Sequence, residues 1–305
     1  MADTWAPEQL RGYAFSIAYR MLGSVGEAED VVQEAMIKLH STDRAEVRSP
    51  TAYTATVTSR LALDQLRSAR VRRERYVGTW LPEPVLGDPD PAERAELRES
   101  LHTAFLVVLE TLGPVERAVF VLHDLFDLPY GEIAEVVGRS EPACRQIAAR
   151  ARRHVADRRP RFDPPAAERG QLVRRFFAAL EAGDVEALER QLAADVVFYG
   201  DGGGKGPAVR KPVLGSLQVA RFLAGLVRAA RRYELELAPA VINGSPGLRV
   251  LDQDGRLLDV LSVDLRDGLV AEVRSIVNPD KLQHLGPVRN AAELLGSPQP
   301  GGNAR

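Results

Sequence analysis

The sequence predicts a multidomain protein in which two small all-helical domains precede one α+β domain. Up to about residue 159, apolar residues recur at the three-to-four spacing of amphipathic helices. After Tyr233 the spacing becomes two, which is typical of strands. Proline-rich breaks at 76–91 and at "RRPRFDPP" separate the three parts, and 305 residues are enough to form them.

The composition excludes several classes of protein. There is no run of about 18 apolar residues, and the N-terminus lacks the basic-then-apolar pattern of a signal peptide. The single cysteine, Cys144, excludes an internal disulfide and a cysteine-rich zinc site. We therefore expect a cytoplasmic protein with no membrane contact, no metal and no cofactor.

Arginines gather in two places, although the net charge is −2. Six arginines lie between residues 60 and 75 and eight between residues 139 and 161, each group with only two acidic residues. Two basic clusters in a nearly neutral chain indicate two contacts with a polyanion. Solvated helix faces are the alternative explanation.

The first helical part covers residues 10–75. Ser24 and Glu27 form the pattern of a capping box, which predicts a helix start. Ser49-Pro50 predicts the start of another helix, which ends in the first arginine cluster.

The second helical part, 92–159, contains "LPYGEIAEVVGRSEPACRQIAARARRHV". A helix from about Tyr130, a turn at Gly138 and a new helix capped by Ser140 together predict a helix-turn-helix. The N-terminal side chains of its second helix are candidates for reading base edges in the major groove: Ser140, Glu141, Ala143, Arg145 and Gln146. Later arginines suit phosphates: Arg150, Arg152 and Arg153. A helical hairpin with a basic surface is the alternative.

The third part begins with the helical stretch "LVRRFFAAL" and continues with strands. The turns Asp254-Gly255 and Asp267-Gly268 divide apolar runs and predict antiparallel hairpins. The tail "GSPQPGGNAR" has the composition of a disordered segment.

With these features, the chain resembles the extracytoplasmic-function sigma factors of bacterial RNA polymerase. "AYRMLGSVGEAEDVVQEAMIKL" is similar to the core-binding part of sigma region 2, and "SPTAYTATVTSRLALDQLRSARVRRER" to its promoter −10 part. The helix-turn-helix stretch, extended back to "LGPVERAVF", is similar to sigma region 4, which reads the −35 element.

Three further motifs, "WLPEP", "DGGGK" and "NPDKL", resemble the marks of the sigma group that carries a SnoaL-like C-terminal extension. This resemblance implies a cone-shaped domain of the nuclear-transport-factor-2-like fold. The domains expected on these grounds are region 2 at 8–75, a proline-rich linker at 76–91, region 4 at 92–160, the SnoaL-like domain at 170–285 and a flexible tail at 286–305.

The resemblance also implies roles for residues. An acidic and amide face would bind the β′ clamp helices of the polymerase core: Glu29, Asp30, Gln33 and Glu34. Region 4 would contact the β flap. Residues of region 2 would hold the melted −10 strand: Arg48, Tyr53, Arg60, Arg67, Arg70, Arg72 and Arg73. Tyr53 as a stacking side chain and Tyr53 as plain core remain equal alternatives.

The segment "WLPEP" (Trp80–Pro84) poses a question, because nothing nearby in the sequence buries its Trp and Leu. We expect it to dock on the third domain, near "DGGGK" or "NPDKL", and to control the spacing of the two DNA readers without a separate anti-sigma factor. Packing on the sigma helices is the alternative. The residues assigned to this contact are Trp80, Leu81, Pro82, Asp201, Gly202, Gly203, Lys205, Asn278, Pro279, Asp280 and Lys281.

We expect no catalysis by the third domain. Its fold includes enzymes with a buried carboxylate, and the candidates here are Asp195, Asp201, Asp259 and Asp264, but no nucleophile pattern accompanies them and His284 has no evident partner. The glycines of "DGGGK" suit either an anion cradle or a tight turn. Two other functions stay open: a helix-turn-helix regulator that does not bind polymerase, and a SnoaL-type enzyme or ligand sensor fused to a DNA-binding domain. Cys144 is expected to pack inside its helix pair rather than act as a redox switch.

Overall fold

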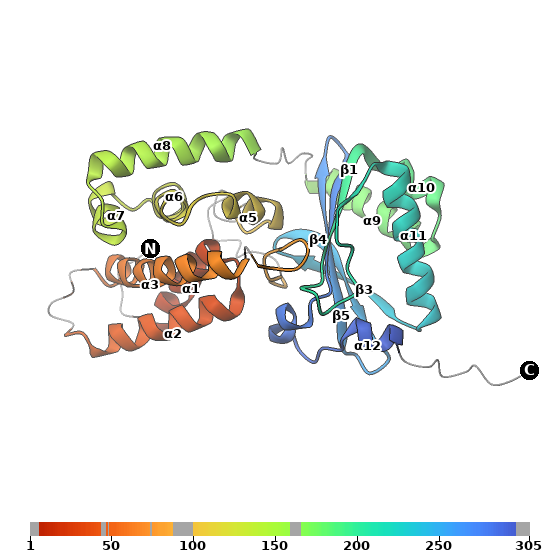
Figure 1. The fold of residues 1–305 in the computed structure, drawn as a ribbon, viewed down its shortest axis with the longest axis horizontal. Coiled ribbons are helices and arrows are strands. Elements are labelled where there is room, and N and C mark those ends of the chain that lie inside the picture. The colour runs from red at the N-terminus through yellow and green to blue at the C-terminus, as the bar shows by residue number, and fades with distance from the viewer. Residues whose placement is uncertain are drawn as a thin grey trace, which may run out of the picture. The chain divides into compact units, whose positions relative to one another are not determined.

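The computed structural model describes residues 6–43, 47, 49–73, 75–87, 100–158 and 166–296 (Figure 1). The chain divides into two compact units. The helical unit combines Met1–Arg75 with Pro89–Pro160, and the mixed unit combines Tyr76–Asp88 with Arg161–Arg305. The predicted order of helical and α+β parts is confirmed. None of the helices in the described ranges is long and apolar enough to span a membrane.

The first helical segment contains three helices, α1 (Pro7–Leu22), α2 (Val25–Ser41) and α3 (Pro50–Arg73). Ser24 caps α2 as predicted, because its hydroxyl accepts a hydrogen bond from the Glu27 amide at 3.2 Å. The Ser49 hydroxyl likewise accepts from the Ala52 amide at 3.1 Å at the start of α3.

The second helical segment contains α5 (Thr103–Glu110), α6 (Pro114–Phe120), the π-helix η2 (Val121–Leu125), α7 (Tyr130–Val137) and α8 (Glu141–Arg158). Helices α7 and α8 form the predicted helix-turn-helix. Gly138 ends α7 in the left-handed conformation, with φ of 68°, which a residue without Cβ adopts at no steric cost. The two helical segments contact each other within one compact unit.

The mixed unit is a six-stranded sheet with helices on one face (Figure 1). Its strands are β1 (Leu192–Asp201), β2 (Val213–Leu214), β3 (Glu236–Ile242), β4 (Ser245–Leu251), β5 (Leu257–Arg266) and β6 (Leu269–Ile276). Their order is β2-β1-β6-β5-β4-β3; β1 and β6 are parallel, and the other pairs are antiparallel. Helices α9 (Ala166–Ala182), α10 (Val185–Glu189) and α11 (Ser216–Arg232) pack their apolar sides on the sheet.

Tight turns join the antiparallel strands of this sheet. The predicted turn at Asp254-Gly255 lies between β4 and β5, where the Gly255 amide donates to the Asp252 carbonyl at 2.9 Å. Asp267 and Gly268, with φ of 53° and 75°, form the predicted hairpin turn between β5 and β6. Asn243 and Gly244, with φ of 50° and 74°, form an equivalent turn between β3 and β4 that the sequence analysis did not identify.

The C-terminal residues differ from the expected flexible tail at 286–305. After η3 (Pro279–Lys281) and η4 (Gln283–Leu285), the chain runs along β5, and α12 (Ala291–Gly296) follows. The Leu257 amide donates to the Pro287 carbonyl at 2.8 Å, and the Arg289 amide donates to the Leu257 carbonyl at 3.0 Å. Residues 286–296 are therefore ordered by backbone pairing, which composition does not reveal. The expectation for residues 297–305 lies outside the described residues.

Candidate functional site

The WLPEP segment lies against the other two motifs within the mixed unit. Asp201, at the end of β1, is fully buried and accepts hydrogen bonds from the Tyr76 hydroxyl at 2.5 Å and from the Leu81 amide at 2.8 Å. The Lys281 ammonium lies 2.8 Å from Asp201 Oδ2 and also donates to the Leu81 carbonyl. We call these four residues, together with Asn278, the docking network.

Two aromatic rings lie close to the Lys281 ammonium of the docking network. The Lys281 Nζ lies 4.2 Å from the ring centroid of Trp80 and 4.9 Å from that of Tyr76, within the range of a cation–π interaction. The Asn278 amide donates to the Tyr76 hydroxyl at 2.8 Å. Burial and the neighbouring Asp201 carboxylate both raise the pKa of Tyr76, so its hydroxyl keeps the proton that it donates. Sequence reasoning missed Tyr76, which lies four residues before Trp80.

The glycines of "DGGGK" permit this close approach. Gly203 has φ of 56°, and a Cβ there would lie 2.3 Å from Asn278 Nδ2 and 2.8 Å from the Tyr76 hydroxyl. A Cβ on Gly202 would lie 2.5 Å from the Gly206 carbonyl oxygen. The structure thus accounts for the glycines as a tight turn packed against the linker. Lys205 points outward and pairs with the exposed Asp280 at 2.5 Å.

The other end of the linker extends the sheet. The Asn243 amide donates to the Val85 carbonyl at 2.8 Å, and the Gly87 amide donates to the Val241 carbonyl at 3.0 Å, so residues 85–87 pair with the edge of β3. His284, which had no evident partner in the sequence, lies 2.7 Å from the Pro84 carbonyl oxygen through Nε2. Linker residues 76–87 are therefore held at both ends.

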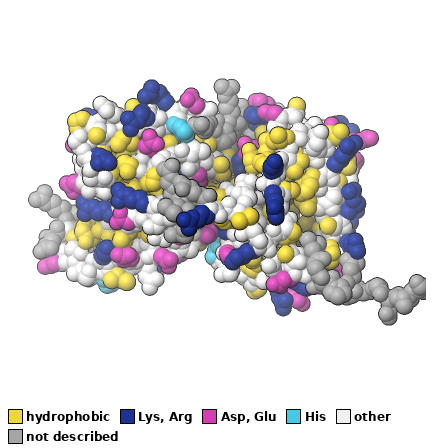
Figure 2. Space-filling view, in the orientation of Figure 1, with side chains coloured by type: hydrophobic (Ala, Val, Ile, Leu, Met, Phe, Trp, Pro, Cys, Tyr) yellow, Lys and Arg dark blue, Asp and Glu magenta, His cyan; other side chains and the backbone are white. Residues whose placement is uncertain are grey.

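The predicted −35 residues lie on the outer side of α8. Ser140, Glu141, Arg145 and Gln146 are exposed, and the Ser140 hydroxyl lies 3.4 Å from the Ala143 amide at the start of the helix. Arg145 pairs with Glu141 at 2.6 Å, and Arg152 pairs with Asp124. Arg150 and Arg153 are exposed. Figure 2 shows Lys and Arg side chains interspersed with Asp and Glu side chains on one face of the molecule.

Cys144 is fully buried on the inner side of α8. Burial raises the pKa of its thiol, and the Glu141 carboxylate acts in the same direction. Both effects disfavour the reactive thiolate, so the structure supports a packing role.

The predicted −10 residues have different environments. Arg67 is exposed beside Asp64 at 3.0 Å, and Arg60 lies 4.0 Å from Glu135 of α7. The Tyr53 hydroxyl shares a 2.8 Å hydrogen bond with Thr42. Arg48 and the side chains of Arg70 and Arg72 lie outside the described residues.

Among the −10 arginines whose side chains the structure describes, Arg73 differs from Arg60 and Arg67, because it lies largely buried in a polar seam between the two helical segments. Glu110 of α5 pairs with Arg73 of α3 and with Arg117 of α6. Both arginines also donate to the last carbonyls of α1: Arg73 to Leu22, and Arg117 to Met21 at 2.9 Å. Burial lowers the pKa of Arg73, and the Glu110 carboxylate opposes that effect. In this arrangement the Arg73 guanidinium is engaged by these partners, and only 15% of its side chain is exposed for phosphate binding.

The predicted polymerase-binding residues share the outer face of α2. Asp30, Gln33 and Glu34 are exposed, and Glu29 pairs with Arg11. Ile37 follows at helical spacing on the same face and is 62% exposed. A single exposed isoleucine is common on protein surfaces. Because Ile37 shares its helix face with the three exposed polar candidates, it extends the same surface.

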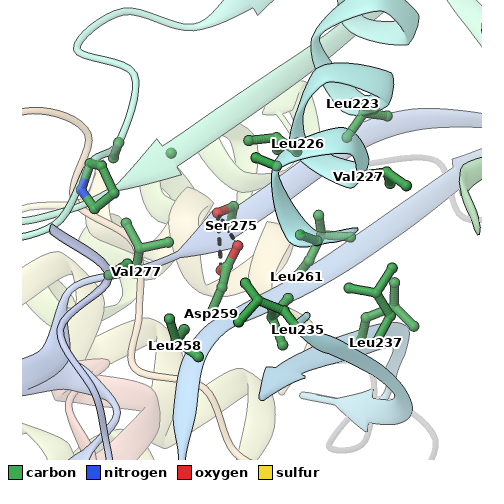
Figure 3. A pocket seen from close by; sticks show the side chains of 18 of the residues that line it. Leu223, Leu226, Val227, Leu235, Leu237, Leu258, Asp259, Leu261, Ser275 and Val277 are labelled. Carbon is green, nitrogen blue, oxygen red and sulfur yellow. Dashed lines mark hydrogen bonds between the residues drawn. The ribbon is translucent and has the colours of Figure 1, made fainter. Parts of the chain in front are cut away.

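An apolar cavity lies between α11 and the sheet (Figure 3). Asp259 of β5 faces into it, and its two carboxylate oxygens accept from the Ser275 hydroxyl at 3.0 and 2.9 Å. Burial raises the pKa of Asp259 to about 6, although hydrogen bonds from Ser275 and two backbone amides oppose the rise. The other three candidate carboxylates lie elsewhere. Asp195 pairs with Arg266 at the surface, Asp264 pairs with the buried Arg274, and Asp201 belongs to the docking network.

Comparisons with known proteins agree with this geometry. Family models match the chain for "Sigma-70 region 2" at residues 8–72, "Sigma-70, region 4" at 102–155 and "SnoaL-like domain" at 173–273. The chain is 43% identical over 289 residues to the ECF RNA polymerase sigma factor SigJ of Mycobacterium tuberculosis, covering 90% of this chain and 91% of SigJ. It is 32% identical over 278 residues to the probable ECF sigma factor SigI of the same species, covering 90% and 93% of the two chains.

The fold agrees as well. The crystal structure of M. tuberculosis SigJ matches with a TM-score of 0.72 and 39% identity, over 92% of this chain and 98% of that one. The helical unit, the helix-turn-helix and the sheet domain are thus found together, in the same order, in a relative of nearly equal length. The chain belongs to the extracytoplasmic-function RNA polymerase sigma factors of the sigma-70 family and carries a SnoaL-like C-terminal domain.

Proposed function

We propose that this sigma factor is controlled in cis, by docking of the linker between regions 2 and 4 on the SnoaL-like domain. The observation that carries the proposal is the buried Lys281–Asp201 pair, which binds both the amide and the carbonyl of Leu81. An ion pair is costly to bury unless its remaining hydrogen-bonding groups are satisfied, and here the linker backbone satisfies them.

Docking determines how region 2 is tethered. The helix that carries the −10 arginines ends at Arg73, three residues before Tyr76, the first residue of the docking network. Released from the network and the β3 edge, the chain from Arg73 to Ser100 reaches about 90 Å when extended. Docking removes residues 76–87 from that length. Because both promoter elements must be bound at once, a restrained linker favours the spacing that serves the promoter.

The finer parts of the proposal follow from the positions of the side chains. The outer face of α2 binds the β′ clamp helices, region 4 contacts the β flap, and α8 reads the −35 duplex. The linker contact takes the place of a separate anti-sigma factor, and the SnoaL-like domain performs no chemistry.

Transcription in vitro with purified core polymerase, on promoters selected from a random library, tests the proposal. Trp80→Ala removes the ring over Lys281, and we expect it to reduce initiation while leaving core binding unchanged. A chain cut after Leu285 keeps the whole docking network, so it should still initiate. Initiation by Trp80→Ala equal to that of the unaltered protein would refute control through the linker, and no initiation by any form would refute the transcription function.

Ile37→Glu should weaken association with core polymerase by about tenfold, because a charge replaces an exposed apolar side chain on the proposed contact face of α2. The measurement is the affinity of labelled sigma factor for core enzyme. Leu214→Glu is the matched control, since Leu214 is 64% exposed on the SnoaL-like domain and should tolerate the same change. Equal affinities for the two variants would remove Ile37 from the interface.

A further inference from the structure

The cavity between α11 and the sheet has the size and lining of a small-molecule site. Its volume is about 170 Å³. An apolar cavity of about 150 Å³ holds one benzene molecule, so this one accommodates a single ring or a short aliphatic chain. Among its described lining residues, the polar side chains are Asp259, Ser275 and Tyr233. A largely apolar cavity with a few converging polar groups is the usual form of a ligand site.

Asp259 defines what such a ligand must offer. A carboxylate has about four acceptor positions, and three donors reach that of Asp259: the Ser275 hydroxyl and the amides of Val260 and Ile276. One acceptor position is therefore left for a ligand. The Asp259 side chain lines the cavity and points into it (Figure 3). A hydrogen-bond donor on the ligand stabilises a carboxylate that faces apolar walls, whereas a hydrogen-bond acceptor on the ligand is repelled by it. The matching ligand therefore carries a hydroxyl rather than a carbonyl.

We propose that this cavity binds a small apolar alcohol or phenol through Asp259, and that occupancy stabilises the docked linker.

Two strands connect the cavity to the docking network. Gly200 of β1 lines the cavity and directly precedes Asp201, and Val277 lines it and directly precedes Asn278. The Val277 amide donates to the Asp201 carbonyl at 2.9 Å. Residues 207–209, which follow the DGGGK turn, line the same cavity. A ligand packed on these residues restricts the backbone that holds Asp201 and Gly203 against the linker.

Helix α12 supplies another wall, through Ala291 and Leu294. Backbone pairing of residues 287–289 with Leu257 holds this helix in place. The C-terminal segment thus encloses the cavity and is itself held by β5, the strand that carries Asp259. A cut after Leu285, which retains the docking network, removes this wall and should weaken ligand binding.

The test uses the full-length protein with cyclohexanol and cyclohexanone, which share a ring but present a donor and an acceptor. Ligand-observed NMR titration should give saturable binding of cyclohexanol, with a dissociation constant of about 1 mM or lower, and at least about tenfold weaker binding of cyclohexanone. Asp259→Asn should abolish this selectivity, because a carboxamide offers both a donor and an acceptor. Asp195→Asn, at an exposed carboxylate outside the cavity, should preserve it.

A second variant keeps the test valid if Asp259→Asn does not fold. Ala229→Leu fills the cavity from α11 with a good helix former, and it should eliminate binding of both probes. Equal binding of alcohol and ketone, or cyclohexanol binding that survives Ala229→Leu, would overturn the site.

The effect of the ligand on the linker rests on the proposed docking, and it is measured separately from ligand binding. In a Trp5→Phe background Trp80 is the remaining tryptophan, and cyclohexanol should protect it from acrylamide quenching. Selective binding without any change in quenching would refute the link and leave the site standing. Neither readout involves transcription, so failure of the transcription proposal would be recognised separately.

Discussion

Lys281→Met is expected to destabilise the SnoaL-like domain by about 3–5 kcal/mol and to release the linker. The substitution keeps the aliphatic stem but removes the ammonium, so the fully buried Asp201 carboxylate loses its countercharge. The Leu81 carbonyl loses its partner at the same time. Urea unfolding in a Trp5→Phe background, followed by Trp80 fluorescence, measures both the loss of stability and the release.

The same motifs supply the matched control for this experiment. Lys205 and Asp280 also form a pair at 2.5 Å, but their side chains are 56% and 53% exposed. Lys205→Met should therefore cost less than about 1 kcal/mol. The double variant Asp201→Asn, Lys281→Met removes both buried charges and should recover part of the loss. Similar small losses for Lys281→Met and Lys205→Met would show that burial of the pair does not hold the linker.

Local signals made much of this fold predictable. The helix-turn-helix was predictable because Gly138 and Ser140 act on their own neighbours, as a left-handed helix end and an N-terminal cap. The hairpin at Asp267-Gly268 was predictable for the same reason. The contact of WLPEP was expected because a Trp and a Leu between prolines have nothing local to bury them.

Features that depend on distant residues could not be predicted in this way. The Tyr76 hydroxyl can enter the docking network because Gly203, which is far away in the sequence, has no side chain to exclude it. Arg67 and Arg73 belong to one arginine cluster, but only Arg73 meets Glu110, so the sequence could not tell which arginine is buried. Asp259 was one of four candidate carboxylates, and only the packing of α11 on the sheet separates it from the others.

The order of residues 286–296 has a similar cause. The composition of the tail from Gly296 onward predicts disorder, but the preceding residues pair through their backbone with Leu257, and backbone pairing leaves no mark in composition. The enclosure of the cavity by α12 was therefore not predictable.

Glu110→Gln is expected to open the helical unit and to increase its affinity for single-stranded DNA. Glu110 compensates two arginines in the seam between regions 2 and 4, and the side chain of Arg117 is only 3% exposed. Without this carboxylate, the nearest carboxylate to Arg73 that remains among the described ion pairs is Glu27 at 3.9 Å. Arg117 keeps its hydrogen bond to the Met21 carbonyl, which carries no charge. Removing one partner of such a cluster costs about 3–5 kcal/mol.

Opening changes DNA binding because Arg73 is occupied in the closed seam. If only the open form presents the full −10 surface, apparent affinity scales with the population of that form. We expect a gain of at least about tenfold for a single-stranded oligonucleotide, and a salt dependence steeper by about 0.7 for each phosphate contact added. Hydrogen exchange at the last turn of α1 and at α5 should rise in parallel, because those elements meet at the seam.

Glu135→Gln separates this effect from a general change of charge. Glu135 also pairs across the two helical segments, with Arg60, but the pair is 4.0 Å apart and its side chains are 51% and 74% exposed. That substitution should leave hydrogen exchange unchanged and alter DNA affinity little. If both variants bound DNA alike, charge alone would explain the gain. If Glu110→Gln left exchange and affinity at their original values, the buried seam would not restrain the DNA-binding surface of region 2.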